Sequence, residues 1–495
     1  MLSSLPLISL ILITLPIGAA LIWLVPARFS RWIALATAVV DLILALGILL
    51  GFDSSNPNFQ YVERLSWIPS LGIQYHVGID GISVLFLPLT VLLFNAILLA
   101  SWNGVTFLPR LYYTLLLLLE STTLGIFCAL DTMLFFFFWE LTLIPIYFLI
   151  SLWGIGPHRR YAAVKYTLFM MAGGIPLLFG FLLLAFNHAS INGGGIPEGL
   201  IFDYTVLIAE NLPANMQQLV FFLLLLGFLV KVPVVPFHTW LPTVAMEGPI
   251  AIAAIMTGLK LGVYGLIRFT LPLAPQAAAE YHWLLAGFGV VGILYGALVA
   301  LAQTNLRRML AFSSISHVGL VVLGIASFNI NGIQGALFQL LNFTTVSAGL
   351  FLLTGFLHHR IGSTDIIRLG GIATAMPLLA GFYFFFGLAS IGVPGTNGFP
   401  AELLLIISAL SKHTGAGLAA LFAIILGAGY FLRIYRRSFL GPVSNDVIRD
   451  SLDLRPRELF LITILTLLIL LPGFWPDSIL NITAAASQAW LAQWP

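Results

Sequence analysis

The sequence has one cysteine and few charges. Cys128 is the only cysteine in 495 residues. This excludes a disulfide framework and any Cys-rich metal or iron–sulfur site on the chain. Charged residues make up 8% of the sequence, against about 25% in a soluble globular domain, and hydrophobic residues make up 60%. A soluble core cannot bury that much apolar surface, so we predict an integral membrane protein that lies almost entirely in lipid.

Signals for other classes are also missing. No strand–glycine–helix nucleotide fingerprint occurs, and the glycine run at 193–195 is better explained as a flexible turn. Residues 5–24 lack a basic start and a small-x-small cleavage site, so they are interpreted as a first membrane span and not as a secretion signal. We expect no nucleic acid partner and no bound cofactor or metal on this chain.

Apolar runs between polar or Gly/Pro-rich breaks predict about fourteen membrane helices of roughly 20 residues each. They lie near residues 5–24, 32–52, 81–101, 111–130, 133–152, 166–186, 217–240, 249–271, 283–303, 309–326, 333–357, 373–408, 414–435 and 459–476. The twelfth run is long enough to contain a break. The fold class is therefore all-α and polytopic.

Basic residues alternate between the loops, as the positive-inside rule expects. One set of alternate loops carries sixteen of the 21 Lys and Arg, whereas the opposite set carries only Arg64, Arg268 and Lys412. This predicts both termini on the outer side and the basic loops in the cytoplasm or stroma. The two remaining basic residues, Lys231 and Lys260, lie inside the membrane.

These two lysines fall at similar distances from the short connection near residue 245, so two successive antiparallel helices place both near mid-bilayer. A charge at that depth costs about 3 kcal/mol or more, so both must line a polar interior. Glu140 and Glu402 are carboxylates within other spans, and Glu140 is the natural counter-ion for a lysine. The alternative is that the lysines form purely structural ion pairs.

Other polar groups at depth are less specific. His317 follows three serines inside a span, which favours a hydrated proton path, although a lone buried histidine can also be merely hydrogen-bonded. Glu120 is either part of such a path or a helix–helix contact. His238 lies nearer the end of its span and could simply anchor it there. Asp41, in the second span, has no argued role.

Two spans carry clustered helix breakers. "KVPVVPFHTWLP" interrupts the seventh span, and "SIGVPGTNGFPAE" interrupts the twelfth. Paired interruptions in two halves are typical of transporter repeats. We predict two inverted five-helix repeats, helices 4–8 and 9–13, with helices 7 and 12 broken. The predicted units are 1–110 with helices 1–3, 111–271, 283–435, and 436–495 with a loop and helix 14.

Several stretches together resemble the antiporter-like, proton-pumping membrane subunits of complex I and the related multi-subunit cation/proton antiporters. They are "VGIDGIS", "FFFFWELTLIPIYFLI", "KVPVVPFHTWLP", "GLKLGVYGLIR", "SSISHVGLV" and "LASIGVPGTNGFPAE". Within this group the chain resembles the subunit M, chain 4 or NdhD type, because Glu402 stands where the L and N types carry lysine.

The resemblance implies a role for each matched position. Glu140 would pair with Lys231 at the start of the path, and Lys260 would be the central relay. His317 would lead into the second half, and Glu402 would release the proton outward. One departure concerns span eleven, where Phe343 replaces the histidine usual in the family. Either neighbouring Thr344 and Thr345 with water replace that relay, or this variant couples differently.

The resulting hypothesis is a non-redox, proton-translocating subunit of an NAD(P)H- or ferredoxin-dependent quinone or plastoquinone oxidoreductase. Its partners would be other antiporter-like and quinone-site membrane subunits, a hydrophilic redox arm that holds the iron–sulfur clusters, and lipid. The membrane would be a bacterial inner membrane or a thylakoid. The alternatives are a subunit of a multi-subunit Na⁺/H⁺ antiporter, a scaffold whose charges only lock helices together, and a stand-alone transporter.

Overall fold

We describe the fold from a computed structural model that places residues 6–210 and 212–494. Within these residues, twelve helices are long and apolar enough to cross a membrane, and two shorter apolar helices, Phe86–Ala100 and Pro377–Ser390, accompany them. The chain is therefore a polytopic helical membrane protein, as predicted. Residue 5, the predicted start of the first span, lies outside the described residues.

The helices of the N-terminal half follow the predicted apolar runs. Their bounds are α1 Leu7–Leu24, η2 Ala27–Phe29, α2 Ser30–Leu50, α3 Phe86–Ala100, α4 Pro109–Cys128, α5 Thr132–Leu141, α6 Leu143–Trp153, α7 Arg159–Ile191, α8 Tyr204–Leu207, α9 Ala214–Lys231, η4 Phe237–Thr239, α10 Trp240–Glu247, α11 Ile250–Gly258, α12 Leu261–Gly265, η5 Leu266–Thr270 and α13 Leu271–Leu273. The seventh predicted span is thus broken after Lys231, as its two prolines require.

The C-terminal half also combines continuous and interrupted helices. Its elements are α14 Pro275–Glu280, α15 His282–Ala302, α16 Leu306–Ile325, α17 Ile330–Asn342, η6 Phe343–Ser347, α18 Ala348–Ile361, η7 Ile366–Arg368, α19 Ile372–Ala375, α20 Pro377–Ser390, α21 Gly398–Lys412, α22 Thr414–Ser438, α23 Asp446–Arg449, α24 Pro456–Phe474 and α25 Asp477–Leu491. The twelfth predicted span is broken between Ser390 and Gly398. Helix α25 follows the last predicted span and was not expected from the sequence.

Three further irregularities were not predicted. The eighth span is interrupted at Leu259 and Lys260, which separate α11 from α12. Two π-helical segments follow, η5 within the same span and η6 at Phe343–Ser347 in the eleventh. Such π-segments are rare and occur frequently at functional sites. The sequence has no proline at these places, so the breaker pattern missed them.

A two-stranded antiparallel hairpin, β1 Gln60–Ile68 and β2 Ile73–Ile79, lies outside the helical bundle. It adds a β element to a chain expected to be all-α. The short turn η3 Pro69–Leu71 joins its strands. The hairpin is fastened to the start of α5, because Asp131 caps that helix and also accepts a hydrogen bond from the backbone N–H of Gln74 at 3.0 Å.

A second fastening of the hairpin involves Asp203, which forms ion pairs with Arg64 at 2.8 Å and with His76 at 3.2 Å. Burial opposes ionisation of this carboxyl, but hydrogen bonds from His76 and Thr205 and the charge of His76 lower its pKa to about 2. Asp203 therefore stays charged at any physiological pH and holds the hairpin against the bundle.

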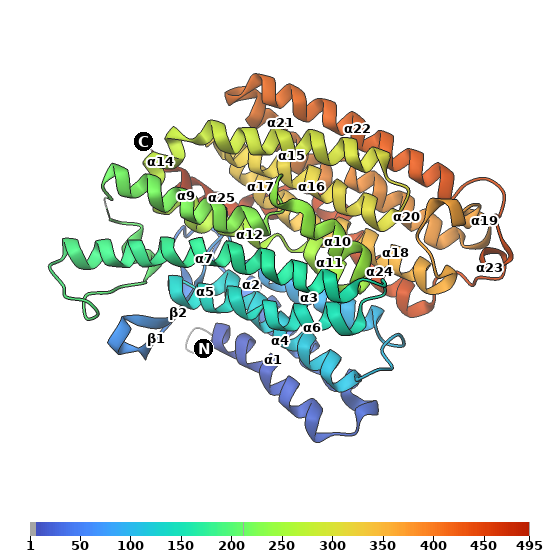
Figure 1. The fold of residues 1–495 in the computed structure, drawn as a ribbon, viewed down its shortest axis with the longest axis horizontal. Coiled ribbons are helices and arrows are strands. Elements are labelled where there is room, and N and C mark those ends of the chain that lie inside the picture. Colours follow the sequence, from blue (N-terminus) through green and yellow to red (C-terminus); the bar gives the residue numbers. More distant parts are fainter. Residues whose placement is uncertain (1–5, 211, 495) are drawn as a thin grey trace.

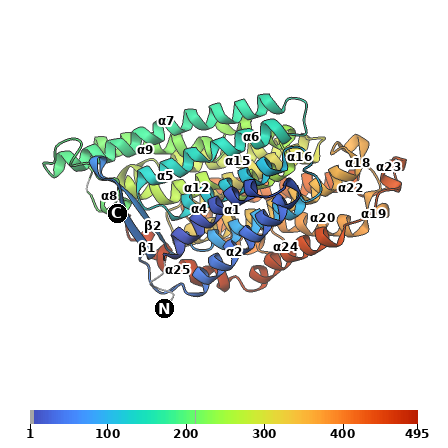
Figure 2. The same cartoon turned by 90° about the horizontal axis from the view of Figure 1, so that it is seen from below.

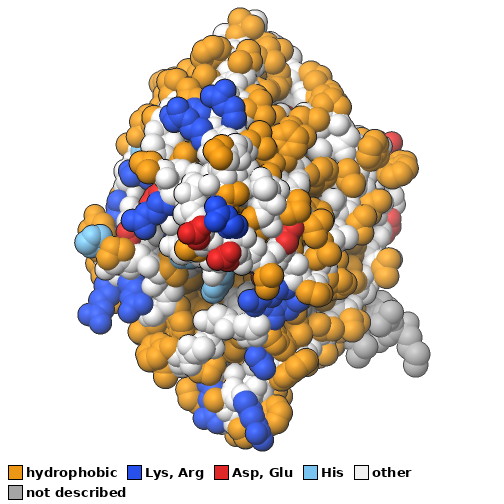
Figure 3. Space-filling view, turned by 90° about the vertical axis from the view of Figure 1, so that its right-hand side faces the viewer, with side chains coloured by type: hydrophobic (Ala, Val, Ile, Leu, Met, Phe, Trp, Pro, Cys, Tyr) orange, Lys and Arg blue, Asp and Glu red, His pale blue; other side chains and the backbone are white. Residues whose placement is uncertain are grey.

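The long helices share one direction, and basic side chains lie at one of the two ends of the molecule. The long helices lie roughly side by side along the horizontal direction of Figure 1, and the start of α1, the end of α25 and the hairpin lie towards its left. Figure 2 shows the same grouping from below. Lys and Arg side chains are scattered over the opposite end, which faces the viewer in Figure 3.

Candidate functional site: a line of buried titratable side chains

Lys231 is the last residue of α9 and lies directly before the first helix break. Its side chain is buried. The ammonium donates a hydrogen bond to Thr142 Oγ1 at 3.2 Å and lies 3.8 Å from the ring centroid of Trp139. A cation over an indole face is stabilised by the negative face of the ring. Thr142 and Trp139 both come from the α5–α6 segment that also carries Glu140, so this segment surrounds the lysine.

Glu140 does not pair with Lys231 in this structure. Among the ion pairs made by the described residues, neither side chain appears. The Oε1 atom of Glu140 is buried without a hydrogen-bond partner. It occupies the space beside Gly174 of α7, where a Cβ atom would collide with it. The Glu140–Lys231 ion pair that the resemblance implies is therefore not formed among the described residues.

Lys260 lies in the unwound step between α11 and α12. Gly262, two residues further on, packs so closely on the first break that a Cβ there would lie 2.7 Å from Val232 N and 3.0 Å from Lys231 C. The Lys260 ammonium donates to Ser314 Oγ of α16 at 2.6 Å and lies 5.2 Å from the Phe343 ring centroid. The two helix breaks therefore meet, and the second points towards α16.

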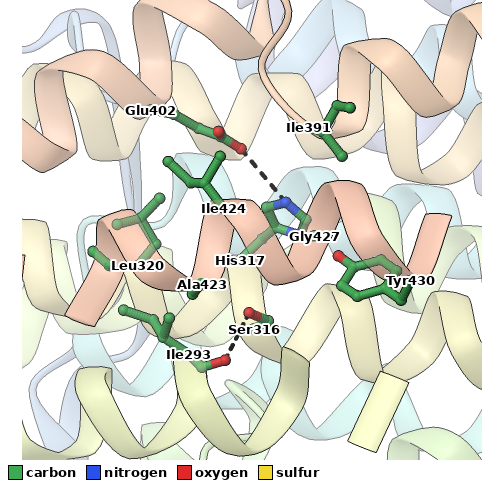
Figure 4. A pocket seen from close by; sticks show the side chains of 11 residues that line it. Ile293, Ser316, His317, Leu320, Ile391, Glu402, Ala423, Ile424, Gly427 and Tyr430 are labelled. Carbon is green, nitrogen blue, oxygen red and sulfur yellow. Dashed lines mark hydrogen bonds and ion pairs between the residues drawn. The ribbon is translucent and has the colours of Figure 1, made fainter. Parts of the chain in front are cut away.

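His317 stands one turn after Ser314 on α16. Its Nδ1–H donates to Ser313 O at 2.8 Å, an assignment that leaves Nε2 free as the acceptor. That Nε2 atom lies 3.5 Å from Glu402 Oε1 of α21 (Figure 4). Ser313 is itself held by a 2.7 Å hydrogen bond between its Oγ and Tyr430 OH. The imidazole is thus oriented with one nitrogen fixed to the backbone and the other facing the carboxyl.

Two small cavities meet at His317. One is lined on one side by Ser314, Asn342 and Phe343, and the other by Glu402 and Tyr430. Figure 4 shows Glu402 and His317 pointing towards each other across the second cavity. Each cavity combines polar groups with an apolar wall, which is the environment in which buried water is held by protein hydrogen bonds. Phe343, which replaces the family histidine, lines the first cavity beside Lys260.

Glu402 depends on the break before α21. Its carboxyl is buried, and Gly392 (φ +69°) lies against it so closely that a Cβ would meet Oε2. A positive φ and this contact both require glycine at that position. Asn397, at the start of α21, donates to Thr345 Oγ1 of η6 at 3.0 Å. The twelfth-span break and the π-segment are therefore joined, with Glu402 between them and His317.

The remaining predicted residues lie off this line. Glu120 is completely buried in α4 with both carboxyl oxygens unpartnered, and so is Asp41 in α2, which packs against α4. His238 is buried in η4, and its ring lies 5.0 Å from the centroid of Tyr295. His238 is therefore packed in the interior and does not lie at an exposed interface. Within the described residues, none of these three side chains forms a hydrogen bond with Lys231, Lys260, His317 or Glu402.

The sequence analysis missed the roles of two residues and misplaced a third. Thr142 and Ser314 are the hydroxyl partners of the two lysines, and only their spacing from Glu140 and His317 could have indicated this. Arg268, assigned to an outer loop, is instead buried in η5. It forms a two-point ion pair with Asp80 at 2.5 and 2.8 Å. The loop assignment was wrong because a buried partner 188 residues away compensates the charge.

These features define a class: a polytopic helical membrane protein with interrupted spans and a chain of buried titratable groups. The sequence profile described as NADH:quinone oxidoreductase/Mrp antiporter, TM, matches residues 129–427, which include every residue from Glu140 to Glu402. The chain belongs to this family of transmembrane subunits.

Individual relatives agree with this assignment. NADH-quinone oxidoreductase subunit M from Rickettsia bellii is 38% identical, over 92% of this chain and 90% of that protein. NAD(P)H-quinone oxidoreductase chain 4 1 from Nostoc sp. is 37% identical, over 94% of this chain and 88% of that protein. The expected resemblance to the subunit M or chain 4 type is confirmed.

Solved structures give the same fold. A chain of respiratory complex I from Thermus thermophilus with bound NADH has a TM-score of 0.89 at 29% identity, covering 99% of this chain and 100% of that chain. A chain of the Mrp complex from Dietzia sp. has a TM-score of 0.81 at 23% identity, covering 98% of this chain and 52% of that chain. The second likeness concerns the fold alone.

Proposed function

We propose that this chain translocates protons as a membrane subunit of an NAD(P)H- or ferredoxin-dependent quinone oxidoreductase. The path runs from Lys231 to Lys260, through Ser314 and His317, to Glu402. The observation that carries the proposal is the contact chain through the membrane interior, above all the 2.6 Å Lys260–Ser314 and 3.5 Å His317–Glu402 contacts. The relatives named above support it, since they are subunits of NADH- and NAD(P)H-quinone oxidoreductases.

The driving step is electrostatic. When Glu140 lies beside Lys231, the ion pair holds a proton on the lysine. When Glu140 turns to the position beside Gly174, Lys231 loses its counter-ion and passes its proton towards Lys260. Thr142 and the Trp139 ring keep the ammonium in place meanwhile.

The second half of the path avoids Phe343. Ser314 and His317 lie one turn apart on α16 and line the same cavity, so a proton can move from Lys260 to the imidazole through the serine hydroxyl and water. His317 Nε2 then passes it to Glu402. In this proposal the missing family histidine is not replaced by Thr344 or Thr345, whose hydroxyls are bonded to backbone carbonyls of Gly258 and Asn342.

The chain itself would carry no redox group. We place its electron donor, iron–sulfur clusters and quinone on partner subunits, the basic loops in the cytoplasm or stroma, and both termini on the outer side. The partner subunits that carry the redox groups would then affect this subunit only through changes in charge and conformation.

The proposed function is tested with Lys231→Ala in the assembled complex, reconstituted into sealed vesicles. We expect fewer protons moved per electron than in the wild type, because the path loses its first carrier. Lys412→Ala, which removes an exposed lysine, is the matched control and should retain the normal ratio. A normal ratio in Lys231→Ala would refute the path. Sodium-stimulated transport without any electron donor would instead indicate a Na⁺/H⁺ antiporter subunit.

A further inference from the structure

Two histidines meet at a helix junction away from the proton path. His282 is the first residue of α15, and His413 lies between the end of α21 and the start of α22. Their side chains come from positions 131 residues apart, and His282 Nδ1 lies 3.2 Å from His413 Nε2. Both residues are half-buried, so the pair is accessible from solution. Nothing in the proton path uses either residue.

The separation of the two nitrogens suits a shared metal ion. Zinc binds imidazole nitrogen at about 2.0–2.1 Å, so two nitrogens on a tetrahedral ion lie roughly 3.4 Å apart. The ring centroids are 5.0 Å apart and the ring planes are inclined by 35°. This centroid distance is shorter than a straight N–H···N alignment of the rings would give. The ring axes are thus inclined to the line between the nitrogens, as convergence on one ion requires.

We propose that His282 and His413 form a two-histidine binding site for a divalent transition metal ion such as Zn²⁺, with water completing its coordination. Imidazole nitrogen is a preferred ligand of such ions. No cysteine, the other common ligand of Zn²⁺, lies near these histidines in sequence. The charged neighbours in sequence are Glu280 and Lys412. The positive charge of Lys412 opposes the ion, so the site is of moderate affinity.

The two histidines lie at the ends of helices that lead to the residues of the proposed proton path. His413 follows α21 directly, and Glu402 lies about three turns earlier on the same helix. His282 begins α15, which packs against both α16 and α22. A bound ion would therefore tie the outer end of the helix that carries Glu402 to the helix that supports His317.

The test is binding of Zn²⁺ alone to the purified complex, measured by calorimetry in the wild type and in His282→Gln, His413→Gln and the double variant. We expect each single variant to lose the same one equivalent of bound zinc, because the ion needs both imidazole ligands. The double variant should lose nothing further, because both residues serve one ion. His158→Gln, an exposed histidine elsewhere, is the control and should bind like the wild type.

A second measurement separates a metal site from a simple imidazole–imidazole hydrogen bond. Lys412→Gln should bind Zn²⁺ more tightly than the wild type, and added salt should reduce the difference, because the effect is electrostatic. X-ray absorption of the zinc-loaded wild type should show two nitrogen ligands at about 2.0–2.1 Å. Unchanged zinc binding in both histidine variants, or loss in only one of them, would overturn the proposal.

Discussion

At the residue scale, the hydroxyl partners explain how two lysines are tolerated inside the membrane. Thr142 and Ser314 each accept a hydrogen bond from an ammonium group, and the Trp139 ring adds a cation–π contact to Lys231. A hydrogen bond to a charged group is worth about 1.5–3 kcal/mol, a substantial part of the cost of the buried charge. Ser314 differs from Thr142 because it also borders the cavity that His317 lines.

Ser314→Ala tests this role. The variant removes the closer of the two hydrogen-bond acceptors of Lys260, leaving Met256 O at 3.5 Å, and it removes the hydroxyl that leads to His317. We therefore expect proton translocation about tenfold slower, as a loss of roughly 1.4 kcal/mol implies. The measurement is the initial rate of proton uptake by vesicles that contain the complex. Ser327→Ala is the matched control, since the Ser327 hydroxyl bonds to Leu323 O and lines neither cavity at His317. Equal rates in both variants would contradict the assigned path.

At the element scale, the breaks in the spans bring the titratable groups together. The unwound steps after Lys231 and at Lys260 touch each other through Gly262, and the break before α21 wraps Glu402 with Gly392. Unwound backbone survives at membrane depth only when it is buried in protein or borders water. The space beside Gly174 similarly accommodates Oε1 of the Glu140 carboxylate.

The Gly174→Ala substitution fills that gap. The new methyl group collides with Glu140 Oε1, so the carboxylate should move towards Lys231 and stay there. We expect a shorter Glu140–Lys231 distance in a cryo-EM structure of the variant complex, together with slower pumping. Gly381→Ala is the control, because a Cβ at that position meets nothing within 4 Å. A Glu140 carboxylate that stays in place in the variant would show that the pair does not switch in this way.

The sequence predicted the membrane spans because the bilayer itself imposes the length of the apolar runs. It also predicted the breaks at "KVPVVP" and "GVPGTNGFP", where proline and glycine force them. The break at Lys260 was missed because "GLKLGVYG" contains no proline, and the packing of Gly262 on the first break decides it. Arg268 was misplaced for a related reason: its partner Asp80 is distant in sequence, and local composition cannot reveal it.

At the scale of the whole molecule, the Asp80–Arg268 ion pair connects three parts of the chain. Asp80 precedes α3, Arg268 belongs to the eighth span, and Tyr264 in the same span donates to Phe127 O of α4 at 3.0 Å. The C-terminal helix α25 joins them, because Trp490 Nε1 donates to Ile267 O at 2.8 Å. The N-terminal helices, the Lys260 span and the C-terminus are thereby held as one body.

Arg268→Met tests this connection. Removal of one partner leaves the Asp80 carboxylate buried and uncompensated, so we expect a loss of about 3–5 kcal/mol in stability. The double variant Asp80→Leu/Arg268→Met removes both charges and should recover most of that loss. The measurement is the thermal unfolding midpoint of the purified chain in detergent. A single variant as stable as the double variant would show that the pair does not hold these parts together.

The most direct test of the proton path is the number of protons moved per electron by a complex that carries Glu402→Gln. Glutamine keeps the shape of the side chain but cannot release a proton, so the path predicts a ratio below that of the wild type with electron transfer still measurable. Glu198→Gln, at an exposed loop position, should leave the ratio unchanged. A wild-type ratio in Glu402→Gln would contradict the account.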